Sequence, residues 1–123
     1  MKQFFLIFLG GGLGSVLRFA VSKNLNNYFP NFYFGTFLVN ILGCLIIGLL
    51  LGLTLKANYI SENQTLLLAT GFCGGFTTFS TFALENHSLL KSGDIANFLI
   101  YTLFSVVFGI LAIVLGIWIS KFL

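Results

Sequence analysis

Four long runs of hydrophobic residues, separated by short polar connectors, make up almost the whole chain. The runs cover residues 4–21, 32–55, 64–84 and 95–119. Each is close to the roughly 20 residues that an α-helix needs to cross a lipid bilayer. The pattern predicts an all-α membrane protein in which residues 1–123 form a single domain of four transmembrane helices.

The third hydrophobic run is interrupted by the sequence GFCGGFTTFSTF at residues 71–82. The adjacent glycines Gly74 and Gly75 lower helix propensity by about 2 kcal/mol relative to two alanines, and four hydroxyl side chains follow them. Irregular backbone within a membrane is buried in protein or lines a water-filled cavity, and broken helices often mark an ion or substrate site. We therefore expect a broken third helix at a functional site. The alternative is a continuous helix that packs closely through its small residues, with its hydroxyls bonded to the preceding turn.

Composition excludes a soluble globular domain. Hydrophobic residues make up 58% of the chain and charged residues only 7%, whereas about 25% of a typical soluble domain is charged. The net charge of +3 comes from scattered residues, so nothing indicates nucleic-acid binding. The first run could be mistaken for a signal peptide, but its central glycines and Arg18 favour a retained helix.

The positive charges are balanced between the two sides of the membrane. With four spans, one side holds Lys2, Lys56 and Lys121, and the other holds Arg18, Lys23 and Lys91. Because orientation follows the excess of Lys and Arg in cytoplasmic loops, this balance gives no preference. We expect dual topology, in which oppositely oriented copies pair as an antiparallel homodimer. A single orientation, or pairing with an oppositely oriented paralogue, stays open.

The polar residues of the chain do not indicate an enzyme. The three acidic residues, Glu62, Glu85 and Asp94, are expected in connectors or at helix ends, as is His87. Proton relays and exporters of organic cations usually need an acid within the membrane, so this placement disfavours both. The sequence also contains no nucleophile–base pair or nucleotide-binding loop.

The hydrophobic runs instead contain hydrogen-bond donors. Asn40 carries an amide at bilayer depth, and a helix break frees backbone N–H groups that attract an anion. Phe79 and Phe82 share a helix face, and the positive edge of a phenyl ring can meet a small anion. Two alternatives stay open: Asn40 as a hydrogen bond between helices, and Arg18 as a side chain that snorkels to the surface rather than attracting anions.

The sequence GFCGGFTTFSTF resembles the signature of the Fluc (CrcB) family of fluoride channels. GTFLVN at residues 35–40 with Gly43, and GGLG at residues 11–14 before Arg18, are similar to that family as well, so the resemblance covers all four spans. It implies an antiparallel, dual-topology homodimer with two narrow pores in the cytoplasmic membrane. The implied function is passive, selective fluoride efflux that gives resistance to fluoride toxicity.

The resemblance also implies roles for individual residues. Asn40 would be the pore-facing amide, and Phe79 and Phe82 would line the fluoride path. Hydroxyls near the path would come from Thr36, Ser80, Thr81, Tyr101 and Ser105. Backbone carbonyls of Gly74 and Thr77 from both subunits would hold a structural Na⁺ at the dimer interface. Arg18 would lie in the vestibule and Glu85 near the mouth of the pore.

Two other functions are compatible with a small four-span protein. A small multidrug exporter would need an acid in the membrane, which the first hydrophobic run lacks. A non-transporting assembly or regulatory subunit would conduct no ions and would leave the polar break in the third run without a role.

Overall fold

The computed structural model describes residues 1–57 and 59–123, which form a bundle of long helices. In chain order the helices are α1 (Lys2–Leu25), α2 (Phe34–Thr54), α3 (Glu62–Thr65), η1 (Leu66–Cys73), α4 (Gly74–Phe76), α5 (Phe79–Lys91) and α6 (Ile95–Ser120). α3, η1, α4 and α5 together form one bent helical span, Glu62–Lys91, so four spans are long and apolar enough to cross a membrane. The predicted multi-pass helical membrane protein is confirmed.

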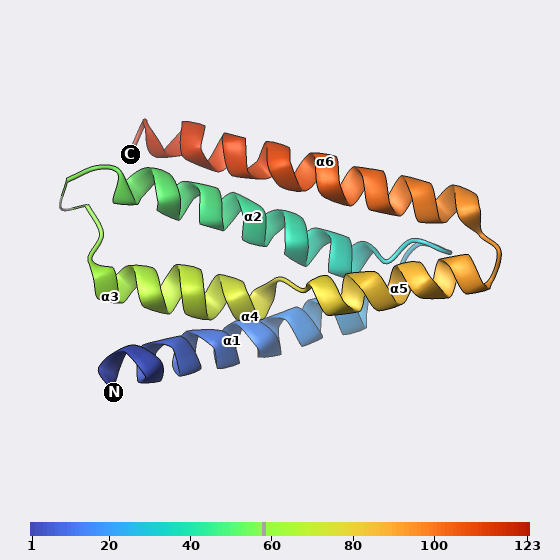
Figure 1. Cartoon of the computed structure of the whole chain (residues 1–123), viewed down its shortest axis with the longest axis horizontal. Helices are drawn as coiled ribbons and strands as arrows, with labels where there is room; N and C mark the ends of the chain where they lie inside the picture. Colours follow the sequence, from blue (N-terminus) through green and yellow to red (C-terminus); the bar gives the residue numbers. More distant parts are fainter. Residues whose placement is uncertain (58) are drawn as a thin grey trace.

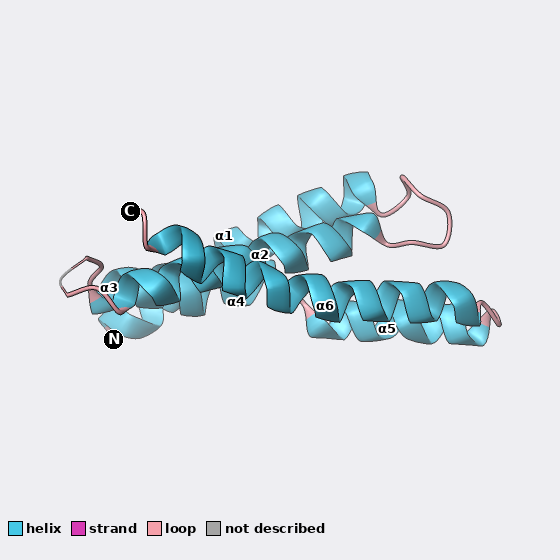
Figure 2. Cartoon of the chain, turned by 90° about the horizontal axis from the view of Figure 1, so that it is seen from above, coloured by secondary structure: helices cyan, strands magenta, loops and turns pink. Residues whose placement is uncertain are grey.

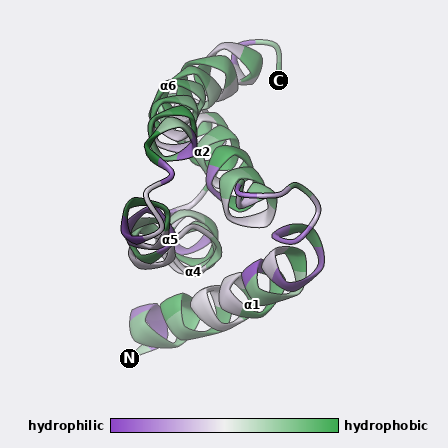
Figure 3. Cartoon of the chain, turned by 90° about the vertical axis from the view of Figure 1, so that its right-hand side faces the viewer, coloured by the Kyte–Doolittle hydropathy of each residue, from purple (hydrophilic) through white to green (hydrophobic). Residues whose placement is uncertain are grey.

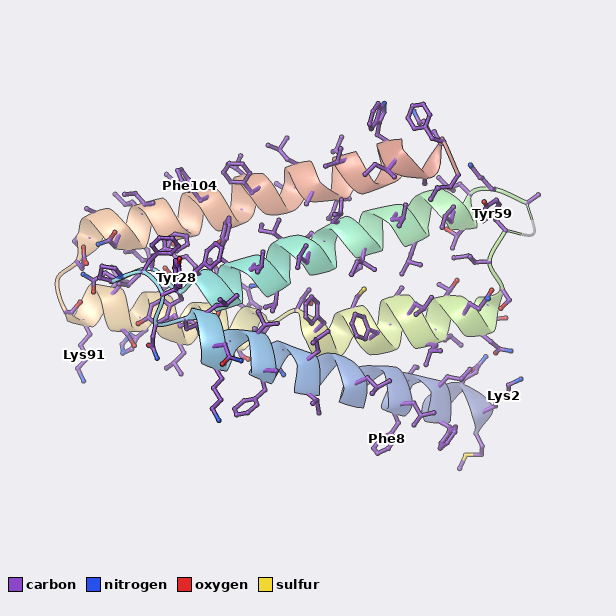
Figure 4. The ribbon with its side chains drawn as sticks, turned by 180° about the vertical axis from the view of Figure 1, so that it is seen from behind. Lys2, Phe8, Tyr28, Tyr59, Lys91 and Phe104 are labelled. Atoms are coloured by element: carbon purple, nitrogen blue, oxygen red, sulfur yellow. The ribbon has the colours of Figure 1, made fainter. Side chains whose placement is uncertain are left out.

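The spans run side by side along the long axis of the molecule (Figure 1). Both termini and the connection from α2 to α3 lie at one end, whereas the α1–α2 and α5–α6 connections lie at the other. Seen from above, these last two connections lie apart from one another (Figure 2). Lys2 and Lys91 mark the opposite ends, and Phe8 and Phe104 point outward, away from the bundle (Figure 4).

Small residues let the helix backbones approach closely in two places. A Cβ atom on Gly48 of α2 would collide with the backbone of Ile113 on α6, and one on Gly14 of α1 would collide with the backbone of Phe72 on η1. Viewed end-on, α4 and α5 lie between α1 and α6 (Figure 3). Because lipid gives helices little hydrophobic reason to associate, close packing on small residues is what holds such pairs together.

The third span is broken, as predicted, but not at the glycines. Gly74 and Gly75 are helical, and the chain becomes extended at Thr77 (φ −83°, ψ 157°) and Thr78 (φ −150°, ψ 122°). Gly75 is used for close packing, because a Cβ atom there would collide with the backbone of Gly11. The Thr78 hydroxyl accepts from the Thr81 N–H at 3.2 Å and begins α5 as its N-cap.

The boundary expected after residue 84 is wrong. α5 continues to Lys91, and the connection to α6 is a short turn in which Gly93 takes φ 79°. Glu85 is therefore not in a connector: it is only 7% exposed inside the bundle, whereas His87 is exposed on α5. These polar residues stay helical because Glu85 and Asn86 hydrogen-bond side chains of α2 and α6, partners that the sequence does not show.

Candidate functional site

The break in the third span is held open by one side chain from α2. The Asn40 Oδ1 atom accepts from the Thr78 N–H at 2.8 Å, and the Asn40 Nδ2 atom donates to the Thr78 carbonyl at 3.1 Å. The amide thus pairs with extended backbone as a neighbouring strand would. In the structure Asn40 hydrogen-bonds the third span from α2, which is one of its two expected roles, and it also lines the groove described below.

This pairing frees backbone carbonyls at the break. In a regular α-helix the Thr78 and Thr81 N–H groups would donate to the carbonyls of Gly74 and Thr77. Here Thr78 donates to Asn40, and Thr81 donates to the Thr78 hydroxyl. Gly74 is exposed, with open space around the position of a Cβ atom. The two carbonyls predicted to bind Na⁺ are thus both released from helical hydrogen bonding.

Arg18 contacts the same segment from α1. Its Nε atom donates to the Gly75 carbonyl at 3.0 Å, and the Ser15 hydroxyl lies 3.4 Å from the same oxygen. Arg18 is half-buried. Its guanidinium is therefore directed at the broken helix rather than only at the surface, and this contact satisfies a carbonyl that the break would otherwise leave free.

A groove of about 300 Å³ lies beside the break. Its lining residues are Asn40, Cys44, Ile47, Thr77, Thr78, Phe79, Phe82, Ser105 and Val106. Phe79 is 79% exposed, so the groove is only partly enclosed by this chain. Among the described residues, the Ser105 hydroxyl is the one buried side-chain polar atom without a hydrogen-bond partner. A buried donor without a partner is costly, so a ligand or water in the groove would satisfy it.

A row of aromatic rings leads from the groove into the bundle. The ring centroids of Phe79 and Phe82 are 6.1 Å apart, and the ring of Phe82 meets that of Tyr101 edge-on at 5.2 Å. In an edge-on pair the positive edge of one ring meets the negative face of the other, which favours this arrangement. Tyr101 is fully buried, so the row ends deep inside the protein.

The inner end of this row is a hydrogen-bonded carboxylate. Glu85 accepts from the Thr36 hydroxyl at 2.6 Å and from the Tyr101 hydroxyl at 2.7 Å. Thr36 is fully buried on α2. Three helices thus place two hydroxyls on one buried acid, and each such bond to a charged group is worth about 1.5–3 kcal/mol.

The structure divides the predicted pore residues into two connected groups. Asn40, Phe79, Phe82 and Ser105 surround the groove, whereas Thr36 and Tyr101 lie with Glu85 at the inner end. Ser80 is exposed, and its hydroxyl lies 3.4 Å from that of Thr78. Thr81 is half-buried, with its backbone N–H bonded to Thr78, and does not line the groove. The roles of all these residues in ion passage stay predictions.

The sequence analysis expects Glu85 near the pore mouth but not buried, and it does not single out Asn86 or Asn26. Glu85 follows Phe82 by three positions, so helical spacing places it beside Phe82 if the helix continues past residue 84. Asn86 is buried too, and accepts from the Thr102 hydroxyl at 3.0 Å. Asn26 hydrogen-bonds Thr36 across the connection between α1 and α2, and no local sequence signal indicates that contact.

Known proteins match nearly the whole chain. The family model described as "CrcB-like protein, Camphor Resistance (CrcB)" matches residues 5–117. A protein of Phocaeicola vulgatus named "Fluoride-specific ion channel FluC" is 51% identical over 122 residues, which cover 98% of this chain and all of the relative. Relatives of the same name are 46% identical in Azobacteroides pseudotrichonymphae, over 99% of this chain and 98% of the relative, and 41% identical in Serratia proteamaculans, over 98% of each. With this agreement along its length, the chain belongs to the CrcB-like family.

Proposed function

We propose that this chain is a fluoride-selective ion channel that mediates passive F⁻ efflux across the cytoplasmic membrane and protects the cell from fluoride. The observation that carries the proposal is that relatives named as fluoride-specific ion channels match 94% or more of this chain at 41–51% identity. A channel of this kind converts no substrate, so the protein is not an enzyme. The groove beside the helix break is the place where three of the four spans, α2, the third span and α6, offer donors to an anion.

The physical need for such a channel follows from acid–base chemistry. In an acidic medium, neutral HF crosses the membrane and releases its proton in the more alkaline cytoplasm, which traps F⁻ because a bare anion crosses lipid poorly. A pore releases the ion down its electrochemical gradient without ATP. The positive edges of Phe79 and Phe82, the free Asn40 N–H and the Ser105 hydroxyl replace part of the hydration shell of a small anion.

One copy of the chain supplies only part of the wall of this path. Phe79 is 79% exposed and Gly74 faces open space, although both lie at the break in the third span. A second copy packed on this face in the opposite orientation would enclose the groove and generate two related paths. The balance of Lys and Arg between the two ends supports both orientations, and an identical chain is the simplest partner.

Dual topology predicts that a reagent on one side of the membrane can label either end of the protein, because each end faces that side in half of the copies. Asn63→Cys, near the termini, and Asn27→Cys, at the opposite end, both place a thiol at an exposed position. In intact spheroplasts, a membrane-impermeant maleimide should label about half of the molecules of each variant, because neither orientation is favoured. Permeabilised spheroplasts give the total. Complete labelling of one variant together with protection of the other would establish a single orientation instead.

The carbonyls of Gly74 and Thr77 fit the proposed structural Na⁺. Both have lost their helical donors, and carbonyl oxygens can replace the hydration shell of an alkali cation. Gly74 lies on the exposed face on which the second copy would pack, so two copies would supply four oxygens to one ion. The ion would offset carbonyl repulsion at the break and link the subunits.

Removal of Na⁺ should therefore weaken the dimer. Protein purified with N-methyl-D-glucamine in place of Na⁺ should melt at a lower temperature and release fluoride more slowly from liposomes. Return of Na⁺ should restore both, because binding to the assembled state alone stabilises it. Equal melting temperatures and fluxes in the two salts would argue against a structural cation at these carbonyls.

The burial of Glu85 also bears on the competing exporter function. A buried acid removes one of the arguments against proton-coupled export of organic cations. The names of the relatives favour fluoride, and both oxygens of Glu85 are occupied by hydroxyls. An exporter of cations would give resistance to a quaternary ammonium dye rather than to fluoride.

Growth under fluoride tests the proposed function in cells. The chain is expressed in a bacterium that lacks its own fluoride exporter, in mildly acidic medium with rising fluoride. It should raise the tolerated concentration, because F⁻ accumulates most when the medium is acidic. The empty vector and the Asn40→Asp variant serve as controls. Resistance to a quaternary ammonium dye without any gain against fluoride would favour the exporter.

A further inference from the structure

Asn26 reaches from the end of α1 to the start of α2. It follows the last residue of α1, and its Oδ1 atom accepts from the Thr36 N–H at 2.9 Å. A backbone N–H can only donate, so this contact fixes which end of the amide is the oxygen. The Nδ2 atom then faces the Thr36 hydroxyl, at 3.2 Å.

The backbone of α2 approaches this contact closely at Gly35. A Cβ atom on Gly35 would lie 2.8 Å from the Asn26 Oδ1 atom and 2.8 Å from the Cα atom of Ser22. The N-cap residue of α2, Tyr33, makes no side-chain capping bond. Asn26 therefore caps α2 from a distant position, where it satisfies an N–H of the first turn.

The same contact sets the direction of the hydrogen bond made by the Thr36 hydroxyl. That hydroxyl has one proton, and an ionised carboxylate can only accept. Because Asn26 donates to the oxygen of Thr36, the proton of Thr36 is directed to Glu85, 2.6 Å away. Thr36 is fully buried and Glu85 is 7% exposed, so water does not readily replace either bond.

We propose that Asn26 is a positioning residue for fluoride passage. It holds the Thr36 hydroxyl in its hydrogen bond to Glu85. The carboxylate at the inner end of the Phe79–Phe82–Tyr101 row therefore keeps both of its hydroxyl donors. If the Thr36 proton turned away, Glu85 would lose one of its two hydroxyl donors, and its charge would repel an anion beside Phe82 more strongly. Asn26 does not line the groove. This inference rests on the proposed channel function.

Asn26→Asp separates the two hydrogen bonds of the side chain, the one that caps α2 at the Thr36 N–H and the one that orients the Thr36 hydroxyl. Aspartate keeps an oxygen for the Thr36 N–H, so the cap on α2 is retained. It lacks the N–H that donates to the Thr36 oxygen and offers a second acceptor for the Thr36 proton. Asn27→Asp is the matched control, because it adds the same charge at an exposed neighbouring position.

The test measures initial fluoride efflux from liposomes, together with melting temperature in detergent. Relative to Asn27→Asp, Asn26→Asp should lower efflux roughly tenfold to a hundredfold, the size of one hydrogen bond to a charged group, with a similar melting temperature. In a Thr36→Val background, which has no hydroxyl to orient, the two aspartate variants should conduct equally.

Three results would overturn the inference. Equal efflux of the two variants when Thr36 is present would remove the role of Asn26. An extra loss that persists with Thr36→Val would show an effect of charge or structure that does not pass through the hydroxyl. Absence of fluoride efflux from the unmodified protein would refute the channel function and this inference with it, a result distinct from the other two.

Discussion

Replacing Phe79 with isoleucine should lower fluoride efflux by up to about tenfold without destabilising the protein. The side chain is 79% exposed in one copy of the chain, so its removal opens no cavity in the core. Isoleucine retains an apolar surface but lacks the positive ring edge. A favourable ring-edge contact is worth up to about 1.5 kcal/mol, which corresponds to roughly tenfold in rate. Initial efflux from liposomes measures fluoride passage, and melting temperature in detergent measures stability.

Phe104→Ile is the matched control for this experiment. Phe104 lies on α6, is 50% exposed and points away from the bundle (Figure 4). The same change of side chain on that surface should leave fluoride efflux close to that of the unmodified protein. Equal efflux from the two variants would mean that Phe79, like Phe104, only contacts lipid.

Asn40→Asp should have the largest effect, a loss of more than about a hundredfold. The substitution replaces the group that donates to the Thr78 carbonyl with a second acceptor, so two oxygens face each other at the break. It also places a negative charge in the groove, where repulsion of an anion at about 4 Å costs roughly 4 kcal/mol. Initial fluoride efflux measures the loss.

Asn40 has two roles, as a hydrogen-bond partner of Thr78 and as a lining residue of the groove. The control Asn63→Asp and a measurement of stability distinguish them. Asn63 is exposed near the start of the third span, and the same substitution there should leave efflux unchanged. A melting temperature of Asn40→Asp close to normal would assign the loss to the groove, whereas a large decrease would assign it to the hydrogen bonds with Thr78. Retained efflux of Asn40→Asp would contradict both roles.

The sequence predicts most of the fold because membrane thickness sets the length of each hydrophobic run. Four runs gave four spans, and the polar stretch at residues 71–82 gave the break. Its position was predicted less well. Propensity favours a break at Gly74 and Gly75, but Gly75 packs on α1 within a helical turn, and the pairing of Asn40 with Thr78 opens the chain further along.

The site was predicted only in part, because the sequence shows which residue types are present but not which helices bring their partners. Phe79, Phe82 and Asn40 are marked by residue type in an unusual place, and the structure brings them to one groove. Glu85 lies in the bundle rather than in the predicted connector, because hydroxyl donors from α2 and α6 offset the cost of a carboxylate there, and these partners are distant in the sequence. The contact of Asn26 with Thr36 depends on how the chain turns between two helices.

Fluoride efflux from liposomes tests the channel most directly. Purified protein is reconstituted into vesicles loaded with potassium fluoride and diluted into fluoride-free buffer, and valinomycin is added to carry the compensating potassium. A passive, selective channel predicts rapid fluoride release with no proton gradient, whereas vesicles loaded with chloride retain it. Fluoride that stays inside, or that leaves only when a proton gradient is imposed, would contradict a passive path along the broken helix.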